Sequence, residues 1–217
     1  MNILPYLSCS SMCTLEMSKQ KFIDQYIYKK KQRISRNMSY GSLMADSLEY
    51  DVSSGDPLLD IMMVKLPKYD LADKVIEDKE NGVEILNPHD KKKYIVPFLK
   101  DGKIKIPLVA KPDSAKSDGT AFLEYKTSTR KWTQKQVDES SQLSFYATAF
   151  WLKNGFIPQD IELVCVQVQY NPDGSLSPTG EMIVYKTQRT MVDIIKMTTR
   201  MKRAWSSIQK LCEKELL

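Results

Sequence analysis

Cysteine is scarce in this chain, and its cysteines follow no spacing typical of a metal site. The 217 residues include four, Cys9, Cys13, Cys165 and Cys212, and no two of them form a Cys-x-x-Cys pair. A disulfide framework and a zinc site are therefore not expected, and the composition suits a reducing cytosol.

Long apolar runs are also missing. No stretch is long and apolar enough to cross a bilayer, and the first residues have neither the basic start nor the sustained apolar core of a secretory signal. No internal repeat or low-complexity tract is present. We therefore expect a cytoplasmic protein with no membrane partner.

The overall composition is that of an ordinary globular protein. Hydrophobic residues make up 42% of the chain and charged residues 27%. The length suits one α/β domain with an adequate core. The formal net charge of +5 permits a polyanionic partner but does not require one.

The strongest functional signal lies between residues 111 and 146. Residues 122–125 are mostly apolar or aromatic and predict a strand, in which Glu124 and Lys126 point to the same face. Asp113 precedes this strand, and Gly119 lies in the connecting turn. Two carboxylates and an amine that converge can hold a hard divalent cation and position a water beside it. A solvated ion pair between Glu124 and Lys126 is the alternative for this motif taken alone.

A well-marked helix follows this strand. Thr133 and Gln136 have the spacing of a capping box, and Trp132 and Val137 that of a hydrophobic staple. Asn154-Gly155 is a stop signal.

Inside the predicted helix, Gln142 and Tyr146 are four residues apart and therefore share one face. Considered alone, the helix would place Tyr146 in the core and Gln142 at the surface. The order of the motifs along the chain favours a functional site instead.

Together these motifs resemble those of the PD-(D/E)XK nuclease superfamily, specifically its RecB-type exonuclease branch. Pro112-Asp113 and Glu124-Tyr125-Lys126 match the catalytic motifs, and Gln142 with Tyr146 matches a Gln-x-x-x-Tyr motif. Residues 8–26 are similar to the opening Ser-x-Ser motif and its helix. Residues 41–49 resemble the motif Gly-x-x-x-His-x-x-Leu-Glu. The match covers about residues 7–170, and the order of its five elements is more specific than any one element.

The resemblance implies a restriction-endonuclease-like core, with a mixed central β-sheet flanked by helices. It implies one nuclease domain over residues 1–217, with a variable insertion at about residues 50–103. Mg²⁺ or Mn²⁺ would be bound by Asp113, Glu124 and the backbone carbonyl of Tyr125. Lys126, Gln142 and Tyr146 would complete the catalytic group. A stand-alone phage or prophage enzyme, acting on DNA in recombination, repair or phage DNA processing, fits this pattern.

The chain departs from the family pattern at one position. Ala45 stands where the second-helix motif has its histidine, while Gly41, Leu48 and Glu49 are in register. Alanine cannot ligate a metal, so Glu49, one turn further along the same face, is a possible substitute ligand. The single histidine, His89, lies in a polar turn and is most simply a loop residue.

Some members of this branch hold an iron–sulfur cluster with one early and three late cysteines. Only Cys212 is available near the end of this chain, so no such cluster is expected.

Basic and hydroxyl side chains near the predicted site are candidates for contacts with the DNA backbone. A charged helix end that faces water is the alternative for the basic residues. The candidates are Lys30, Lys31, Arg33, Arg36, Thr127 and Ser128.

Ala45 keeps a second functional class open, a catalytically weak DNA-binding module that works with a helicase or a single-strand annealing protein. A restriction-type endonuclease is a third alternative. The sequence specifies neither strand polarity nor oligomeric state.

Elsewhere the chain gives weaker signals. Asp101-Gly102 is typical of a hairpin turn, and the hairpin would deliver Asp113. The other expected elements are a helix over residues 11–36, a short helix over 41–49, a loop over 53–57, strands over 161–170 and 181–186 around a turn at 171–174, and a final helix from about Thr190.

Overall fold

The computed structural model describes residues 4–31, 35–50, 52–69 and 98–215. The predicted loop position of His89 lies outside these residues. The elements in chain order are β1 (Leu7–Ser8), α1 (Cys9–Met17), α2 (Lys19–Phe22), a π-helical turn (Ile23–Ile27), α3 (Arg36–Tyr50), α4 (Pro57–Val64), β2 (Phe98–Asp101), β3 (Ile104–Val109), β4 (Ser114–Ala115), β5 (Ala121–Ser128), α5 (Gln134–Asp138), α6 (Ser141–Asn154), β6 (Asp160–Tyr170), β7 (Leu176–Thr187) and α7 (Met191–Glu215).

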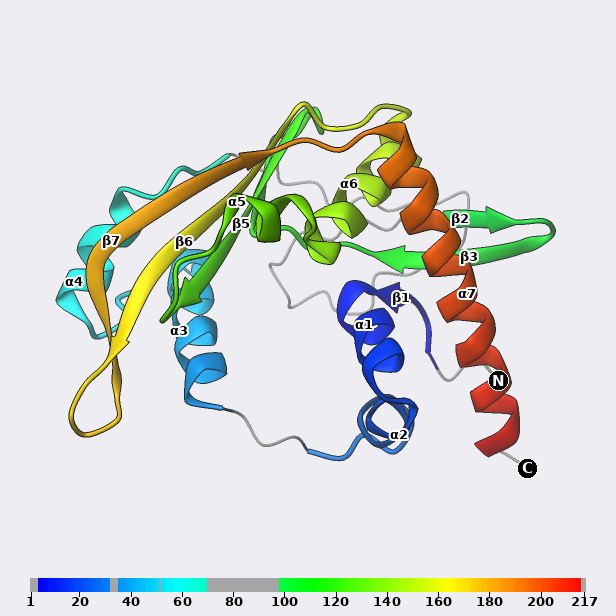
Figure 1. Ribbon diagram of the computed structural model, residues 1–217, viewed down its shortest axis with the longest axis horizontal. Coiled ribbons are helices and arrows are strands. Elements are labelled where there is room, and N and C mark those ends of the chain that lie inside the picture. Colours follow the sequence, from blue (N-terminus) through cyan, green and yellow to red (C-terminus); the bar gives the residue numbers. More distant parts are fainter. Residues whose placement is uncertain (1–3, 32–34, 51, 70–97, 216–217) are drawn as a thin grey trace.

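The described strands form two mixed sheets. The larger has the order β4-β5-β6-β7, with β5 and β6 parallel and the outer pairs antiparallel. The smaller has the order β1-β3-β2, with β1 parallel to β3 and β2 antiparallel to it. Helices flank the sheets (Figure 1). The expected mixed α/β architecture is confirmed, but the hairpin strands β2 and β3 pair with β1 instead of joining the larger sheet.

The larger sheet buries both faces, and the two faces pack against different helices. Phe122 and Leu163 belong to a core cluster with residues of α6 and α7. Leu123 and Val164 belong to a second cluster with residues of α3 and α4. Because side chains alternate along a strand, Glu124 lies on the face that α6 covers. The burial of both faces explains the runs of consecutive apolar residues at 121–123 in β5 and 163–166 in β6.

The helical region near the N-terminus is divided into α1, α2 and a π-helical turn. The prediction of a single helix over residues 11–36 is therefore wrong. Helix α1 begins at Cys9, and Ser18 interrupts it with an extended backbone, φ −163° and ψ 116°. The Ser18 hydroxyl then accepts a hydrogen bond from the amide of Lys21 and caps α2. The π-helical turn ends at Ile27, well before the predicted boundary.

The predicted helix over residues 133–154 is divided into α5 and α6. The Thr133–Gln136 capping box is present, and Gly155 ends α6 with φ 80°, as predicted. Ser140 breaks the helix with ψ 116°, and its hydroxyl accepts a hydrogen bond from the amide of Leu143 to start α6. A serine that caps one helix ends the preceding one, because its own backbone must leave the helical region.

Helix α4 was missed from the sequence. The loop expected over residues 53–57 ends at Asp56, whose carboxylate accepts hydrogen bonds from the amides of Leu58 and Leu59. Pro57 occupies the first helical position, where its missing amide hydrogen costs nothing. Aspartate followed by proline was therefore a helix-start signal. Helix α3 is also longer than the expected residues 41–49, since it begins at Arg36.

The other predicted elements are present, although β7 begins at Leu176, before the predicted residue 181. A hairpin turns at Asp101-Gly102, and a second turn over residues 171–174 joins β6 to β7. Helix α7 starts after Thr190, as predicted, and buries an apolar stripe that includes Ile194, Met201 and Ile208. Among the described helices, none combines the length and apolar character needed to cross a bilayer.

Arg189 connects the α5–α6 break to the segment between β7 and α7. Its side chain is buried, and its guanidinium donates hydrogen bonds to the Thr187 hydroxyl (2.7 Å), the Ser144 hydroxyl (2.8 Å) and the Val137 carbonyl (3.1 Å). Burial lowers the pKa of Arg189. These bonds fix the start of α6 relative to the sheet.

We predict that Arg189→Met destabilises the chain. Removing the guanidinium leaves buried acceptors without donors, which should lower the free energy of unfolding by about 3 kcal/mol. Urea denaturation followed by circular dichroism measures this. The control is Arg203→Met on the exposed side of α7, which should change stability by less than about 0.5 kcal/mol. Equal effects of the two substitutions would show that Arg189 has no such role.

Candidate active site

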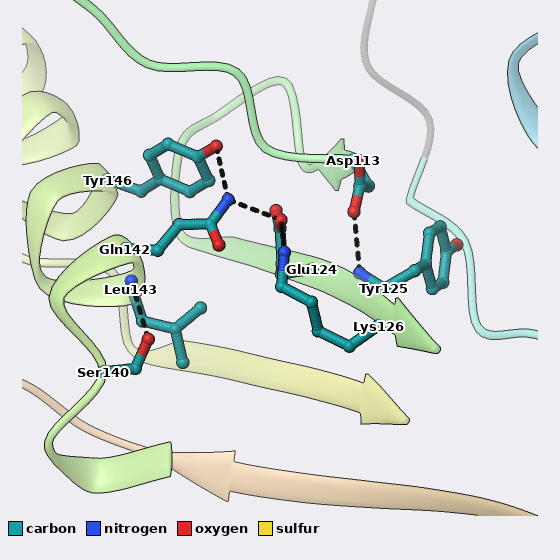
Figure 2. Close-up of polar contacts among 8 residues, drawn as sticks. All are labelled: Asp113, Glu124, Tyr125, Lys126, Ser140, Gln142, Leu143 and Tyr146. Carbon is teal, nitrogen blue, oxygen red and sulfur yellow. Dashed lines mark hydrogen bonds and ion pairs between the residues drawn. The ribbon is translucent and has the colours of Figure 1, made fainter. Parts of the chain in front are cut away.

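Glu124 is the centre of a buried polar cluster on the face of β5 that α6 covers. Only 4% of its surface is exposed. Its Oε1 atom accepts hydrogen bonds from Lys126 Nζ and from Gln142 Nε2, both at 2.6 Å (Figure 2). The Gln142 amide also donates to the Tyr146 hydroxyl at 3.0 Å. The structure therefore brings together four of the side chains predicted from the sequence, from one strand and one helix.

Asp113 reaches the same cluster from the segment between β3 and β4. Its Oδ2 atom accepts a hydrogen bond of 2.7 Å from the backbone amide of Tyr125. The turn after β4 contains Gly119 with φ 75°, and a Cβ there would lie 2.0 Å from the Asn154 side-chain nitrogen. Glycine at this position therefore allows the chain to fold back and place Asp113 beside β5.

The backbone amide of Tyr125 points toward Asp113. In a strand, the amide and the carbonyl of one residue point to the same side. Since the Tyr125 amide donates to Asp113, its carbonyl also faces that edge of β5. The Tyr125 hydroxyl donates to the Pro67 carbonyl at 2.7 Å on the opposite face of the sheet. Tyr125 is thus anchored from behind while its backbone faces the candidate site.

The cluster shifts the protonation of its own members. Burial, opposed by the charge of Lys126 and assisted by that of Asp113, raises the pKa of Glu124 to about 8. For Lys126, burial lowers the pKa, but the carboxylates of Glu124 and Asp113 outweigh burial and the net shift is upward. A general base needs a depressed lysine pKa, so this direction favours an electrostatic role for Lys126.

The donor atoms of the cluster fit a hard divalent cation. Glu124 Oε2 is buried and has no hydrogen-bond partner, so it is available to a ligand. With Asp113 and the Tyr125 carbonyl it offers oxygen atoms only, the donors that Mg²⁺ and Mn²⁺ prefer. In the described part of the chain, no group of three histidine, cysteine or acidic side chains gathers in one place. The donor set therefore consists of two carboxylates and a carbonyl.

The structure places the helix that bears Ala45 on the other face of the sheet. Helix α3 contacts β5, and a Cβ on Gly41 would lie 3.4 Å from the Thr127 hydroxyl. Thr127 shares the face of Tyr125, opposite Glu124. Ala45 is half-buried one turn beyond Gly41. The side chain of Glu49 lies outside the described parts of the structure.

The candidate DNA contacts are not gathered around Glu124. Lys30 forms an ion pair of 2.8 Å with Asp24. Arg36 donates to the Gly174 carbonyl at 2.6 Å in the β6–β7 turn. The Ser128 hydroxyl donates to the Arg130 carbonyl.

Two more of the basic side chains proposed as DNA contacts are Lys31 and Arg33. Lys31 is exposed, and Arg33 lies outside the described residues. The contacts of Lys30 and Arg36 agree better with a stabilising surface role.

Comparisons with known proteins found structural similarity without a sequence match. No family model and no curated protein matches the chain. An alkaline exonuclease, LHK-Exo from Laribacter hongkongensis, shares 14% identity at a TM-score of 0.48, over 96% of this chain and 90% of that one. The structure of LHK-Exo in complex with dAMP gives the same identity and TM-score, over 98% and 92%.

Sequence reasoning missed one neighbour of the cluster, Cys9 at the start of α1. The hydrogen bond with Cys13 and burial raise the pKa of the Cys9 thiol, and the nearby Glu124 carboxylate adds to this shift. The available signal was its position directly after Ser8, which belongs to the first recognised motif. The spacing of the cysteines had directed attention away from it.

We predict that the buried proton on Glu124 makes stability depend on pH when no cation is present. The folded pKa of about 8 lies above the ordinary value of 4.5. Stability from this group is complete below the unfolded pKa and is lost as the pH rises through the folded pKa. The side chain in Glu124→Gln cannot ionise, so this variant does not lose that stability. Its free energy of unfolding, relative to that of the unsubstituted chain, should therefore increase by more than about 1 kcal/mol when the pH is raised from about 5 to about 9.

The measurement is urea denaturation in a chelating buffer at several pH values. Glu162→Gln is the matched control, because Glu162 is a buried carboxylate on the neighbouring strand, paired with Lys186 at 3.2 Å. A difference between Glu124→Gln and the unsubstituted chain that stays constant with pH would contradict the prediction.

Proposed function

We propose that this chain is a Mg²⁺- or Mn²⁺-dependent deoxyribonuclease, an exonuclease of the RecB-type branch of the PD-(D/E)XK superfamily. One observation carries the proposal. The carboxylates of Asp113 and Glu124, the Lys126 ammonium and the Gln142 amide converge, and Glu124 Oε2 is buried without a partner. The motifs that were matched in order along the sequence thus supply the members of one cluster.

Asp113, Glu124 and the Tyr125 carbonyl would hold the cation. When bound, it would lower the pKa of a coordinated water and neutralise charge that develops on the phosphate. The chain fixes these donors in advance. The Tyr125 amide orients Asp113, while Lys126 and Gln142 occupy Oε1 of Glu124 and leave Oε2 available.

Lys126 would act as a positive charge at the reacting phosphate. Its raised pKa keeps it protonated at neutral pH. About a third of its side chain, 31%, is exposed, so the ammonium is anchored on Glu124 while part of the side chain remains accessible to a substrate. A fixed positive charge in a poorly solvated site stabilises developing negative charge more strongly than it would in water.

Gln142 and Tyr146 would act through Glu124. Gln142 bridges the Glu124 carboxylate and the Tyr146 hydroxyl, so that the helix α6 sets the rotamer of the carboxylate. Residues that orient a metal ligand in this way tune its affinity without contacting the metal.

Exonuclease action, as opposed to internal cleavage, rests on the sequence resemblance alone. The same resemblance supports a role in recombination, repair or phage DNA processing, with a helicase or a single-strand annealing protein as a partner. A single nuclease domain over residues 1–217 is part of this proposal.

A second candidate is a DNA-binding module with weak or no catalysis. The observation that favours it is Ala45, which removes the histidine of the family pattern and leaves two carboxylates as acidic ligands. Under this alternative, the chain would retain DNA but neither bind Mn²⁺ nor cut.

We predict that the amide or uncharged variants Asp113→Asn, Glu124→Gln and Lys126→Met lose Mg²⁺-dependent digestion by at least about 100-fold. The substrates are end-labelled linear DNA and covalently closed circular DNA. Release of nucleotides from linear DNA, with the circle left intact, is expected of an exonuclease. Discrete fragments from the circle would identify an endonuclease instead.

Glu162→Gln again serves as the matched control and should keep full activity, since Glu162 pairs with Lys186 away from the cluster. Circular dichroism shows that each variant is folded. Full activity in any one of the three cluster variants would refute the proposed site.

We also predict that Gln142→Ala weakens Mn²⁺ binding by about 10-fold, because Glu124 loses the donor that orients it. Tyr146→Phe should have a smaller effect, since the hydrogen bond between Gln142 and Glu124 remains. Isothermal titration calorimetry with MnCl₂ measures both. A larger loss in Tyr146→Phe than in Gln142→Ala would contradict this order of roles.

A further inference from the structure

The hairpin of β2 and β3 projects from the body of the described chain. Figure 1 shows its two strands running past α7 to a turn that contains Gly102. One face of the hairpin is buried, since Leu99 and Ile106 are paired across the strands and belong to the core cluster with residues of α6 and α7. The hairpin is therefore an arm that is fixed on one face and open to solvent on the other.

The open face carries lysine side chains. Because side chains alternate along a strand, Lys100 and Lys105 point away from the buried face. The two residues are paired directly across the strands, and both are exposed. Lys103 in the turn is exposed as well. Like charges that face each other across a sheet repel, so this pair destabilises the folded chain unless an anion lies against it.

The acidic residue of the hairpin does not neutralise this basic face, which consists of Lys100, Lys103 and Lys105. Asp101 points to the buried side and forms an ion pair of 3.2 Å with Lys202 of α7. No acidic side chain in the described parts of the chain pairs with Lys100 or Lys103. The ion pair with α7 thus anchors the arm and leaves its outer charge in place.

The basic face leads toward the candidate active site. Val109 lies four residues after Lys105 on the same face of β3, about 13 Å along the strand. It is the partner of Ser8, which caps α1. Asp113 follows Lys105 by eight residues, so their Cα atoms are at most about 29 Å apart. This distance corresponds to roughly eight base pairs of duplex DNA.

The composition of the basic face fits a polyanion better than a folded protein. Lysine is depleted in protein–protein interfaces, whereas lysine and arginine supply most contacts to the phosphates of nucleic acids. The one aromatic ring on this face, Phe98, lies 5.6 Å from Lys105 Nζ and packs beneath the charge. The face therefore offers positive charge with little apolar surface.

We propose that Lys100, Lys103 and Lys105 bind the phosphate backbone of DNA at a distance from the phosphate that is cut. The proposal rests on the proposed nuclease function and adds a second contact with the same substrate. Because the lysines meet phosphates and not base edges, this contact positions the DNA without sequence preference. The bound phosphates also screen the repulsion between Lys100 and Lys105.

The test measures binding of a fluorescein-labelled linear DNA duplex in a chelating buffer, in which the proposed nuclease cannot cut. Fluorescence anisotropy at several salt concentrations gives the Kd and its dependence on salt. In the triple variant Lys100→Gln, Lys103→Gln, Lys105→Gln, we expect the Kd to rise at least about 10-fold at low salt. The slope of log Kd against log salt should decrease by about 2 to 3, since each phosphate contact contributes about 0.9.

Two control variants separate the position of the charge from its amount. Lys19, Lys135 and Lys210 are exposed on α2, α5 and α7, and their replacement by glutamine removes the same net charge. This control should keep the slope and change the Kd by less than about 3-fold. Arginine at the three hairpin positions retains the charge and should retain both the Kd and the slope. Circular dichroism shows that each variant is folded.

An unchanged Kd and slope in the hairpin variant would overturn the proposal, and so would an equal loss in the dispersed control. If light scattering without DNA shows that the hairpin variant changes the mass of the chain in solution, while DNA binding stays the same, the occupant is a second copy of the chain instead.

The readout requires no cleavage, so the two proposals can fail separately. A loss of binding in the hairpin variant supports the DNA contact even if Mg²⁺-dependent digestion is absent. Digestion by an unsubstituted chain whose DNA binding does not depend on the hairpin lysines would leave the nuclease proposal standing and refute this one. An unsubstituted chain that binds no DNA would refute both.

Discussion

The burial of the Glu124 carboxylate is the constraint on which the rest of the candidate site depends. A carboxylate removed from water is costly unless hydrogen bonds or opposite charge compensate it. Here Lys126 from the same strand and Gln142 from α6 both donate to one oxygen. The second oxygen has no hydrogen-bond partner, so binding of a cation or a proton there would stabilise the folded chain. Buried ionisable groups that are incompletely compensated are common in sites that bind ligands.

The position of α6 makes this arrangement possible. Ser140 breaks the preceding helix, Arg189 fixes the start of α6, and Gly155 ends it. Without this interruption, a continuous helix over residues 134–154 would approach the sheet along one straight axis. The break gives α6 its own direction, so that Gln142 and Tyr146 face β5. The site therefore depends on contacts that lie well outside it.

The sequence predicted the chemistry of the site better than its surroundings. Strand and helix periodicities paired Glu124 with Lys126 and Gln142 with Tyr146. The order of the motifs and their resemblance to the family pattern joined these pairs to Asp113. The break at Ser140 could not be predicted, since tertiary hydrogen bonds from Arg189 support it. The capping box at Thr133 and the stop at Asn154-Gly155 marked the two ends of one helix, and no glycine or proline lies between them.

Features that depend on contacts between distant segments could also not be predicted from the sequence. The sequence offered Thr127 and Arg36 as DNA contacts, but alternation along β5 turns Thr127 toward α3, and the β6–β7 turn provides the carbonyl that binds Arg36. The hairpin of β2 and β3 was expected, whereas its pairing with β1 was not. Local turn chemistry specifies a hairpin but not the sheet that receives it.

The two carboxylates of the cluster are held in different ways: Asp113 by the backbone of Tyr125, and Glu124 by the side chains of Lys126 and Gln142. The Tyr125 hydroxyl is tied to Pro67 behind the sheet and the Tyr125 amide to Asp113 in front, so Asp113 is held by backbone that cannot move without disturbing two layers. Glu124 is held by side chains alone, and side chains reorient far more easily than a paired strand. Any rearrangement when an ion or a phosphate arrives must therefore be made by Glu124, Lys126 and Gln142, while Asp113 serves as the fixed reference point.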